Sequence, residues 1–209
     1  VPVPATLAAT GTAATSGIPG GLSDFTRHIT LPLIAGKGDR LPVSLFPADG
    51  TWPTGTARLE KRNLALEIPV WESDLCTHCG KCVFVCPHAA IRVKIFPADA
   101  VAAAPATFKH APVRSKDYPA GARMSYQVAP EDCTGCTLCV EVCPIRDKSN
   151  VSRKALNMAA QPPLRAAEAE NWAFFLDLPD GDRRDAKRTA IPGAMLLPPL
   201  FEFSGACTG

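Results

Sequence analysis

Two short runs of cysteines have the residue types and the spacing to bind metal. They occupy residues 76–87 (CTHCGKCVFVCP) and 133–144 (CTGCTLCVEVCP). Both runs read C-x2-C-x2-C-x3-C-P, a spacing that holds 4Fe-4S clusters. Three thiolates spaced in this way lie on a tight loop, whose backbone curls around one corner of a cluster and points its N–H groups at the sulfurs. The two runs therefore predict two iron-sulfur clusters.

The last cysteine of each run is predicted to serve the other run. In this pattern, the signature of two-cluster bacterial ferredoxins, the first three cysteines bind one cluster and the fourth crosses to the second. The fourth cysteine is expected at the start of a short helix, pointing away from its own loop. The predicted ligands are Cys76, Cys79, Cys82 and Cys143 (the cluster-one cysteines), and Cys133, Cys136, Cys139 and Cys86 (the cluster-two cysteines).

Two other readings of the cysteines are a zinc site and a disulfide framework. Zinc takes four ligands in a closed tetrahedron, usually from two separated C-x2-C knuckles, whereas each run here supplies four cysteines at once. Disulfides suit small secreted chains with cysteines spread along them, but eight of the nine cysteines lie in the two runs. The sequence favours reduced, metal-bound cysteines in a reducing compartment, which predicts a cytoplasmic location.

Composition limits the other functions. The chain has 209 residues, 46% of them hydrophobic, which suffices for one or two domains with an ordinary core. Its net charge of +2 gives no reason to expect nucleic acid or a membrane surface as a partner. No apolar run approaches the ~20 residues of a spanning helix. Because the chain starts with Val1 and shows no signal peptide, we expect an excised segment of a longer protein.

The elements around the runs repeat in the same order. Short β segments are predicted before each run, at residues 68–71 and 125–129, and after each run, at residues 92–96 and 154–158, with a brief helix at residues 88–91. We expect residues 92–96 to pair with 125–129, and residues 68–71 with 154–158, both antiparallel. The predicted fold class is α+β, a two-cluster ferredoxin-like domain with a pseudo-twofold βαβ-βαβ arrangement.

The flanking segments contain helices and a linker. Residues 1–23 carry no charged side chain and have the composition of a linker. Ser23 or Asp24 is expected to cap a helix from Phe25 towards Ile34 that ends near Gly36. A second helix is predicted at residues 166–176 (AAEAENWAFFL).

The segment between the two halves is rich in basic residues. It is either a solvated loop or a docking surface for an acidic electron acceptor, because charge steers such encounters. From residue 92 to residue 123, two acidic side chains, Asp99 and Asp117, are outnumbered by Arg92, Lys94, Lys109, Arg114, Lys116 and Arg123.

Several strings outside the cysteines carry a more specific resemblance. They are residues 49–55 (DGTWPTG), 60–63 (EKRN), 68–71 (IPVW), 128–133 (VAPEDC), 170–175 (ENWAFF) and 200–207 (LFEFSGAC). Together they resemble the single-chain pyruvate:ferredoxin (flavodoxin) oxidoreductases, from about Phe25 to the last residue. The cysteine runs alone would suit many ferredoxin-like modules.

The resemblance implies a division of the chain. Residues 1–23 would be linker-like, 24–67 the end of a linking domain, 68–160 the dicluster domain, 161–199 a helical extension, and 200–209 the start of a truncated domain that binds thiamine diphosphate. Cys207 would be the first ligand of a third 4Fe-4S cluster completed by sequence outside this chain. Thiamine diphosphate, Mg and that third cluster would belong only to the complete enzyme, expected to be a homodimer.

The resemblance also implies a reaction. The complete enzyme would convert pyruvate and coenzyme A to acetyl-CoA and carbon dioxide, and this segment would pass the electrons to ferredoxin or flavodoxin, without catalysis of its own. Gly80 and Gly135 would let the backbone approach the cluster sulfurs. With four cysteines for each cluster, His78 and His88 are not expected to be ligands. The alternatives are a stand-alone dicluster ferredoxin, the module of another 2-oxoacid or NADP-linked oxidoreductase, and a structural zinc protein.

Overall fold

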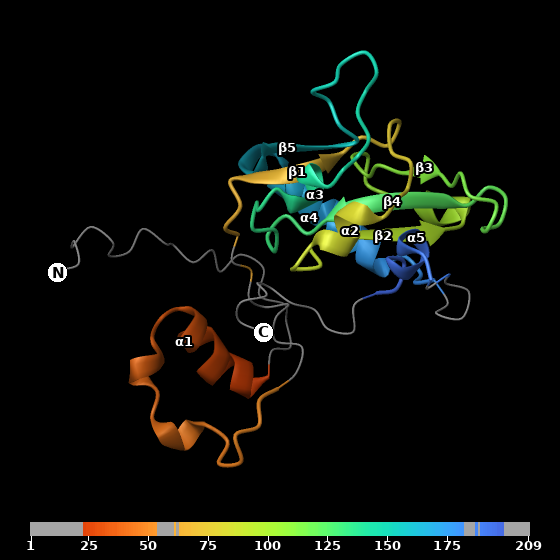
Figure 1. Ribbon diagram of the computed structural model, residues 1–209. Coiled ribbons are helices and arrows are strands. Elements are labelled where there is room, and N and C mark those ends of the chain that lie inside the picture. Colours follow the sequence, from red (N-terminus) through yellow and green to blue (C-terminus); the bar gives the residue numbers. More distant parts are fainter. Residues whose placement is uncertain (1–22, 54–60, 62, 182–186, 188, 199–209) are drawn as a thin grey trace. The chain divides into compact units, whose positions relative to one another are not determined.

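A computed structural model describes residues 23–53, 61, 63–181, 187 and 189–198 (Figure 1). The chain divides into two compact units, residues 1–60 and 61–209. Both cysteine runs belong to the second unit. All but the last residue of the predicted linker, and the predicted third-cluster ligand Cys207, lie outside the described residues.

The described part of the first unit contains one short helical segment. A turn of π-helix at Thr26–Thr30 continues into α1, Leu31–Ile34. The Thr26 backbone N–H donates to the Ser23 hydroxyl at 3.2 Å, which caps the start, and Gly36 ends the segment with a φ of 68°. The predicted helix, with its cap and its glycine stop, is confirmed. Two 3-10 turns follow at Gly38–Arg40 and Val43–Leu45.

The second unit contains two antiparallel sheets. Strand β1 (Glu67–Trp71) pairs with β5 (Leu156–Ala160). The other sheet has the order β2 (Ile91–Phe96), β4 (Arg123–Val128), β3 (Ala111–Pro112). Both predicted strand pairings are confirmed, and the fold is a mixture of helices and strands. β5 starts later than predicted, because the Asn157 side chain binds the backbone N–H and carbonyl of Lys154, at 2.8 and 2.7 Å, and closes a turn there.

The helices near the cysteines correct two predictions. Helices α2 (Lys81–Val85) and α3 (Leu138–Glu141) begin inside the runs, so Cys86 and Cys143 follow them and do not start a helix. The proline after each of these cysteines disfavours helical backbone at the cysteine itself. The helix predicted at residues 88–91 is also absent, since Ala89 has a φ of 48° and Ile91 already begins β2.

The long helix α4 (Gln161–Asp177) packs against β4, and a short helix, α5 (Ile191–Ala194), follows it. Helix α4 is longer than predicted, because Pro162 and Pro163 fit its first turn, where N–H groups have no intrahelical partner. At its other end, the Lys94 ammonium donates to the carbonyls of Leu176 and Leu178, at 3.2 and 2.6 Å. Lys94 is buried by these contacts.

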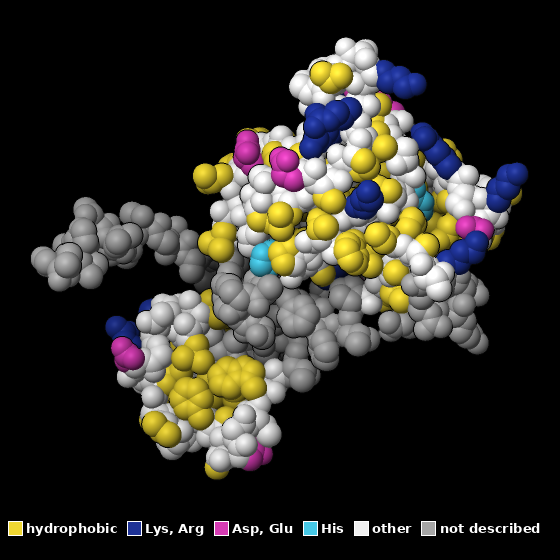
Figure 2. Space-filling model, viewed as in Figure 1, with side chains coloured by type: hydrophobic (Ala, Val, Ile, Leu, Met, Phe, Trp, Pro, Cys, Tyr) yellow, Lys and Arg dark blue, Asp and Glu magenta, His cyan; other side chains and the backbone are white. Residues whose placement is uncertain are grey.

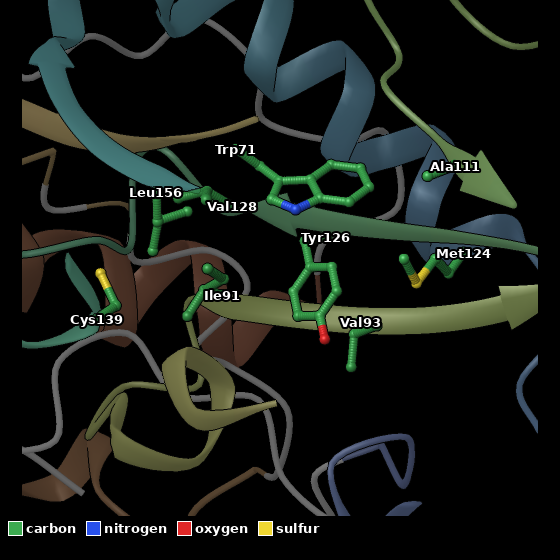
Figure 3. Packing of buried hydrophobic residues seen from close by; sticks show 9 residues of the cluster. All are labelled: Trp71, Ile91, Val93, Ala111, Met124, Tyr126, Val128, Cys139 and Leu156. Atoms are coloured by element: carbon green, nitrogen blue, oxygen red, sulfur yellow. The ribbon is translucent and has the colours of Figure 1, made fainter. Parts of the chain in front are cut away.

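Two groups of buried residues hold the second unit together. The central core, shown in Figure 3, consists of Trp71, Ile91, Val93, Ala111, Met124, Tyr126, Val128, Cys139 and Leu156. The α4 core consists of Ala90, Phe96, Phe108, Ala129, Trp172, Phe175 and Leu178. The cysteine runs pack against both cores, so the predicted metal sites stand on the buried part of the unit.

Candidate metal centre

The two cysteine runs form matching loops at the ends of strands. The first loop lies between β1 and α2, and the second between β4 and α3. In each loop the N–H two residues after the first cysteine donates to its sulfur, from His78 to Cys76 and from Gly135 to Cys133, both at 3.4 Å. The backbone therefore curls around the sulfur in the same way in both loops, as the spacing predicts.

The last cysteine of each run lies near the other run. Burial raises the pKa of Cys76, and the nearby Cys79 and Cys143 thiols raise it further. Burial raises the pKa of Cys133, on which Cys86 and Cys136 also act. Cys143 thus lies beside the first run and Cys86 beside the second. Cys86 lines one cavity with Cys133, Cys136 and Cys139, and Cys143 lies near Cys76.

The two sets are neighbours. Burial raises the pKa of Cys139 to about 12, with smaller contributions from the other three cluster-two thiols. Burial raises the pKa of Cys82 even more, and among the thiols that add to this effect is Cys139 of the other set. Thiols of this kind stay protonated at neutral pH unless a metal displaces the proton, as coordination does.

A cavity shows how the cluster-two cysteines are arranged. All four line it, together with Gly135 and Thr137 from the loop and Pro69 and Val128 from the strands. The donor set is purely thiol, which suits an iron-sulfur cluster. The eight cysteines of the runs are free thiols, so no disulfide framework forms among them. Within the described part of the chain, no three or more Cys, His, Asp and Glu side chains form a group that could hold a metal ion.

The glycines of the loops sit in left-handed turns. Gly80 and Gly135 both have a φ of 71°. A Cβ on Gly80 would lie 3.2 Å from Pro192 Cα, and one on Gly135 would lie 3.2 Å from the Glu67 carbonyl oxygen. Both glycines thus allow a positive φ and a close approach of neighbouring backbone. Their role in letting the backbone approach cluster sulfurs stays a prediction.

Substitution of Gly135 by alanine is expected to lower the free energy of unfolding by about 1–2 kcal/mol, the cost of left-handed backbone for a residue with a Cβ. The contact with Glu67 adds to this cost. Gly181→Ala is the matched control, because that glycine has no positive φ and no described atom lies within 4 Å of where its Cβ would be. Urea unfolding of both variants measures the difference, and equal stabilities would contradict this account of the loop.

Salt bridges tie the two loops to each other. The Arg153 guanidinium, which comes after the second run, lies 2.8 Å from the Glu72 carboxylate and 3.5 Å from that of Asp74, both just before the first run. It also pairs with Asp147 at 3.0 Å. The Lys154 ammonium is buried and donates to the Val140 carbonyl at 2.7 Å, beside Cys139. Both cysteine runs are thus held in place by cations from one segment.

The histidines and two aromatic residues complete the surroundings of the loops. Burial lowers the pKa of His78, so its ring is neutral at neutral pH, and His88 lines the cavity of the cluster-two cysteines. Sequence reasoning missed Trp71 and Tyr126. Tyr126 lies beside the first loop, as the Cys82, Cys76 and Cys79 thiols act on its pKa, which burial raises above its usual range. The Trp71 indole lowers the pKa of Cys76, against the larger effect of burial.

The basic segment between the halves does not form one continuous patch. Lys94 is buried at the end of α4 and cannot belong to a docking surface. The Lys109 ammonium donates to the Trp71 carbonyl at 2.9 Å, and Arg123 Nε donates to His110 Nδ1 at 2.9 Å. Figure 2 shows Lys and Arg side chains scattered over the visible face, among hydrophobic ones. Docking of an acidic electron acceptor at residues 92–123 remains a hypothesis that concerns only the exposed Lys and Arg side chains of this segment.

Comparison with known families identifies two regions. Residues 75–146 match a 4Fe-4S dicluster domain, and residues 12–65 match a domain of unknown function, EKR. The chain thus carries a 4Fe-4S dicluster ferredoxin-like domain over the two loops described above. The part of the chain that the structure describes has no helix with the length and apolarity needed to span a membrane.

Curated relatives match nearly the whole chain. It is 54% identical over 185 residues to the pyruvate-flavodoxin oxidoreductase of Nostoc and 51% identical over 186 residues to a probable pyruvate-flavodoxin oxidoreductase of Escherichia coli. It is 41% identical over 187 residues to the pyruvate:ferredoxin oxidoreductase of Moorella thermoacetica. These alignments cover 88%, 89% and 89% of this chain but only 15%, 16% and 15% of the relatives. The chain therefore corresponds to one segment of these much longer proteins.

Proposed function

We propose that this chain, a homologue of one segment of the pyruvate-flavodoxin oxidoreductases, transfers electrons through two 4Fe-4S clusters with crossed ligands. The observation that carries the proposal is the cavity that Cys86 of the first run lines together with Cys133, Cys136 and Cys139 of the second. Cys143 of the second run likewise lies near Cys76 of the first. A chain that used each run for its own cluster would have no need to bring the fourth cysteines across.

The chain's own residues hold the clusters and adjust them. The cluster-one and cluster-two cysteines would supply four thiolates each, and the N–H groups of His78 and Gly135 would donate to the sulfurs. Each bound cluster supplies a site that takes up and releases one electron. The matching loops and the two strand pairs support a pseudo-twofold relation between the halves of the domain. Cys139 is buried, six of the other cysteines are partly buried, and Cys136 is exposed, so the proposed cluster-two site is open to water at Cys136.

In the longer protein, the segment would serve the oxidation of pyruvate. The relatives' names point to pyruvate as the electron source and to flavodoxin or ferredoxin as the acceptor. Thiamine diphosphate, Mg and a third cluster with Cys207 among its ligands would lie in or next to the remaining domains. The same proposal makes the longer protein a homodimer in the cytoplasm. It assigns residues 24–67 to the end of a linking domain, residues 161–199 to an extension, and residues 200–209 to the start of the thiamine diphosphate domain.

Anaerobic reconstitution tests the proposed function. The full chain is expected to bind about eight iron atoms and to absorb visible light, with midpoint potentials near the ~−400 mV of plant-type ferredoxins or below. The potentials should be low because four thiolates in a largely apolar shell disfavour an additional electron. The reduced chain is expected to reduce flavodoxin or ferredoxin.

Three controls accompany this measurement. A colourless chain that binds zinc would contradict the proposal, and so would a midpoint potential above zero. Pyruvate and coenzyme A in place of dithionite are expected to reduce no acceptor dye, because the proposal assigns the attack on pyruvate to thiamine diphosphate in another domain. Dye reduction by pyruvate would show that the chain is itself an enzyme.

A further inference from the structure

Three buried polar atoms in and beside the first cysteine loop have no hydrogen-bond partner among the residues that the structure describes. They are Trp71 Nε1, His78 Nε2 and the Tyr126 hydroxyl, in side chains that are 5%, 7% and 3% exposed. Buried polar groups are nearly always paired, so an unpaired one calls for an explanation such as a bound group. We call these three residues the ring donors, because each ring can carry an N–H or an O–H.

The ring donors form one contiguous group. The ring centroids of Trp71 and Tyr126 lie 5.3 Å apart, and those of His78 and Tyr126 lie 5.8 Å apart. Figure 3 shows the Tyr126 ring below Trp71, with its hydroxyl pointing away from the indole. The Cys76, Cys79 and Cys82 thiols act on the pKa of Tyr126, and Trp71 acts on that of Cys76. The group therefore stands against the site of cluster one.

The second loop provides an internal comparison. When the two runs are aligned cysteine by cysteine, the positions of the ring donors correspond to Val128 for Trp71, Gly135 for His78 and Pro69 for Tyr126. All three counterparts line the cavity of the cluster-two cysteines, and none has a side-chain hydrogen-bond donor. The backbone donors do not differ: the N–H of His78 and the N–H of Gly135 each lie 3.4 Å from the sulfur of the first cysteine in their loop. The two sites thus differ in their ring donors.

The backbone at His78 strengthens this comparison. His78 has a φ of 63°, a conformation in which a residue with a Cβ is strained, while its counterpart Gly135 adopts 71° without strain. Glycine would therefore serve the turn better. The imidazole at this position is best explained by what its side chain contributes to the site.

We propose that Trp71, His78 and Tyr126 donate hydrogen bonds to the sulfurs of cluster one and thereby give it a higher reduction potential than cluster two. The proposal rests on the proposed function. Reduction adds one electron and its negative charge to the cluster, and a donor stabilises the more negative sulfurs more strongly. Cluster two has no ring donor at the three matching positions, and the side-chain donors that line its cavity, Thr137 and His88, lie at other positions. An electron shared between the two clusters would settle on cluster one.

The test is a redox titration of the reconstituted full chain, followed by electron paramagnetic resonance. The wild-type chain is expected to show two midpoint potentials, and a Cys136→Ala chain, in which cluster two loses a ligand, identifies the signal of cluster one. Tyr126→Phe removes one oxygen. It is expected to lower the reduction equilibrium constant of cluster one by about 2- to 12-fold, the value of one hydrogen bond. A tenfold change corresponds to 59 mV for a one-electron couple.

Two further variants and a control separate tuning from damage. Trp71→Phe and His78→Gly, which reproduces the second loop, are expected to shift cluster one in the same direction and to leave cluster two unchanged. Tyr118→Phe is the matched control, since Tyr118 lines a cavity without cysteines, and it should shift neither cluster. If Tyr126→Phe retains fewer than eight iron atoms, His78→Gly takes its place in the test. The proposal then requires His78→Gly to lower the potential of cluster one and to leave that of cluster two unchanged.

The outcomes of the proposed function and of this inference are distinct. A wild-type chain without eight iron atoms would overturn both. A chain that holds both clusters, but in which the three variants leave cluster one unchanged or shift both clusters equally, would overturn only the role of the ring donors.

Discussion

A chain with both Cys86→Ala and Cys136→Ala is expected to keep about four iron atoms in one intact cluster, whereas a chain with Cys86→Ala and Cys79→Ala is expected to keep no intact cluster. With crossed ligands, the first pair of substitutions removes two ligands from cluster two only. The second pair removes one ligand from each cluster. Iron analysis and the spectrum of the reduced protein distinguish the two results.

The reciprocal pairs make the test symmetric. Cys143→Ala with Cys79→Ala should leave cluster two intact, and Cys143→Ala with Cys136→Ala should damage both clusters. If each run held its own cluster, all four results would be reversed. The single substitution Cys86→Ser should likewise damage the cluster of Cys133, Cys136 and Cys139, although Cys86 lies much closer in sequence to Cys82.

The sequence predicted those features that depend on spacing and alternation. The predicted cysteine sets followed from a motif whose chemistry fixes how many residues separate the ligands. In the structure Cys86 lies near Cys133 and Cys143 near Cys76, and the ligation itself stays a prediction. The strand pairs followed from alternating apolar residues in a duplicated order. In both cases the information lies within a few neighbouring residues.

Features that depend on tertiary contacts escaped prediction. Tyr126 comes from β4 and meets a loop that is distant in sequence, so no local pattern marks it. Lys94 had the appearance of a surface charge, but the end of α4 provides carbonyls that only the folded chain brings to it. The ends of α2 and α3 were predictable in principle, because the residue before a proline avoids helical backbone.

Phe175→Ala is expected to lower the free energy of unfolding of the second unit by about 3–5 kcal/mol, which is a large part of the ~5–15 kcal/mol of a typical domain. The Phe175 side chain is 0% exposed and stacks on Trp172 at a centroid distance of 5.4 Å, at the centre of the α4 core. Its removal leaves a cavity that the rigid β2 and β4 cannot fill.

The same substitution should affect the two clusters unequally. Cys86 and Cys133, both cluster-two cysteines, pack against the α4 core, whereas no cluster-one cysteine does so. Loosening of α4 should therefore release the iron of cluster two first, in urea concentrations that leave cluster one in place. Leu176→Ala is the matched control. That neighbouring side chain is 43% exposed, so its truncation should lower the free energy of unfolding much less than Phe175→Ala does. Loss of both clusters at the same urea concentration would show that α4 does not support cluster two selectively.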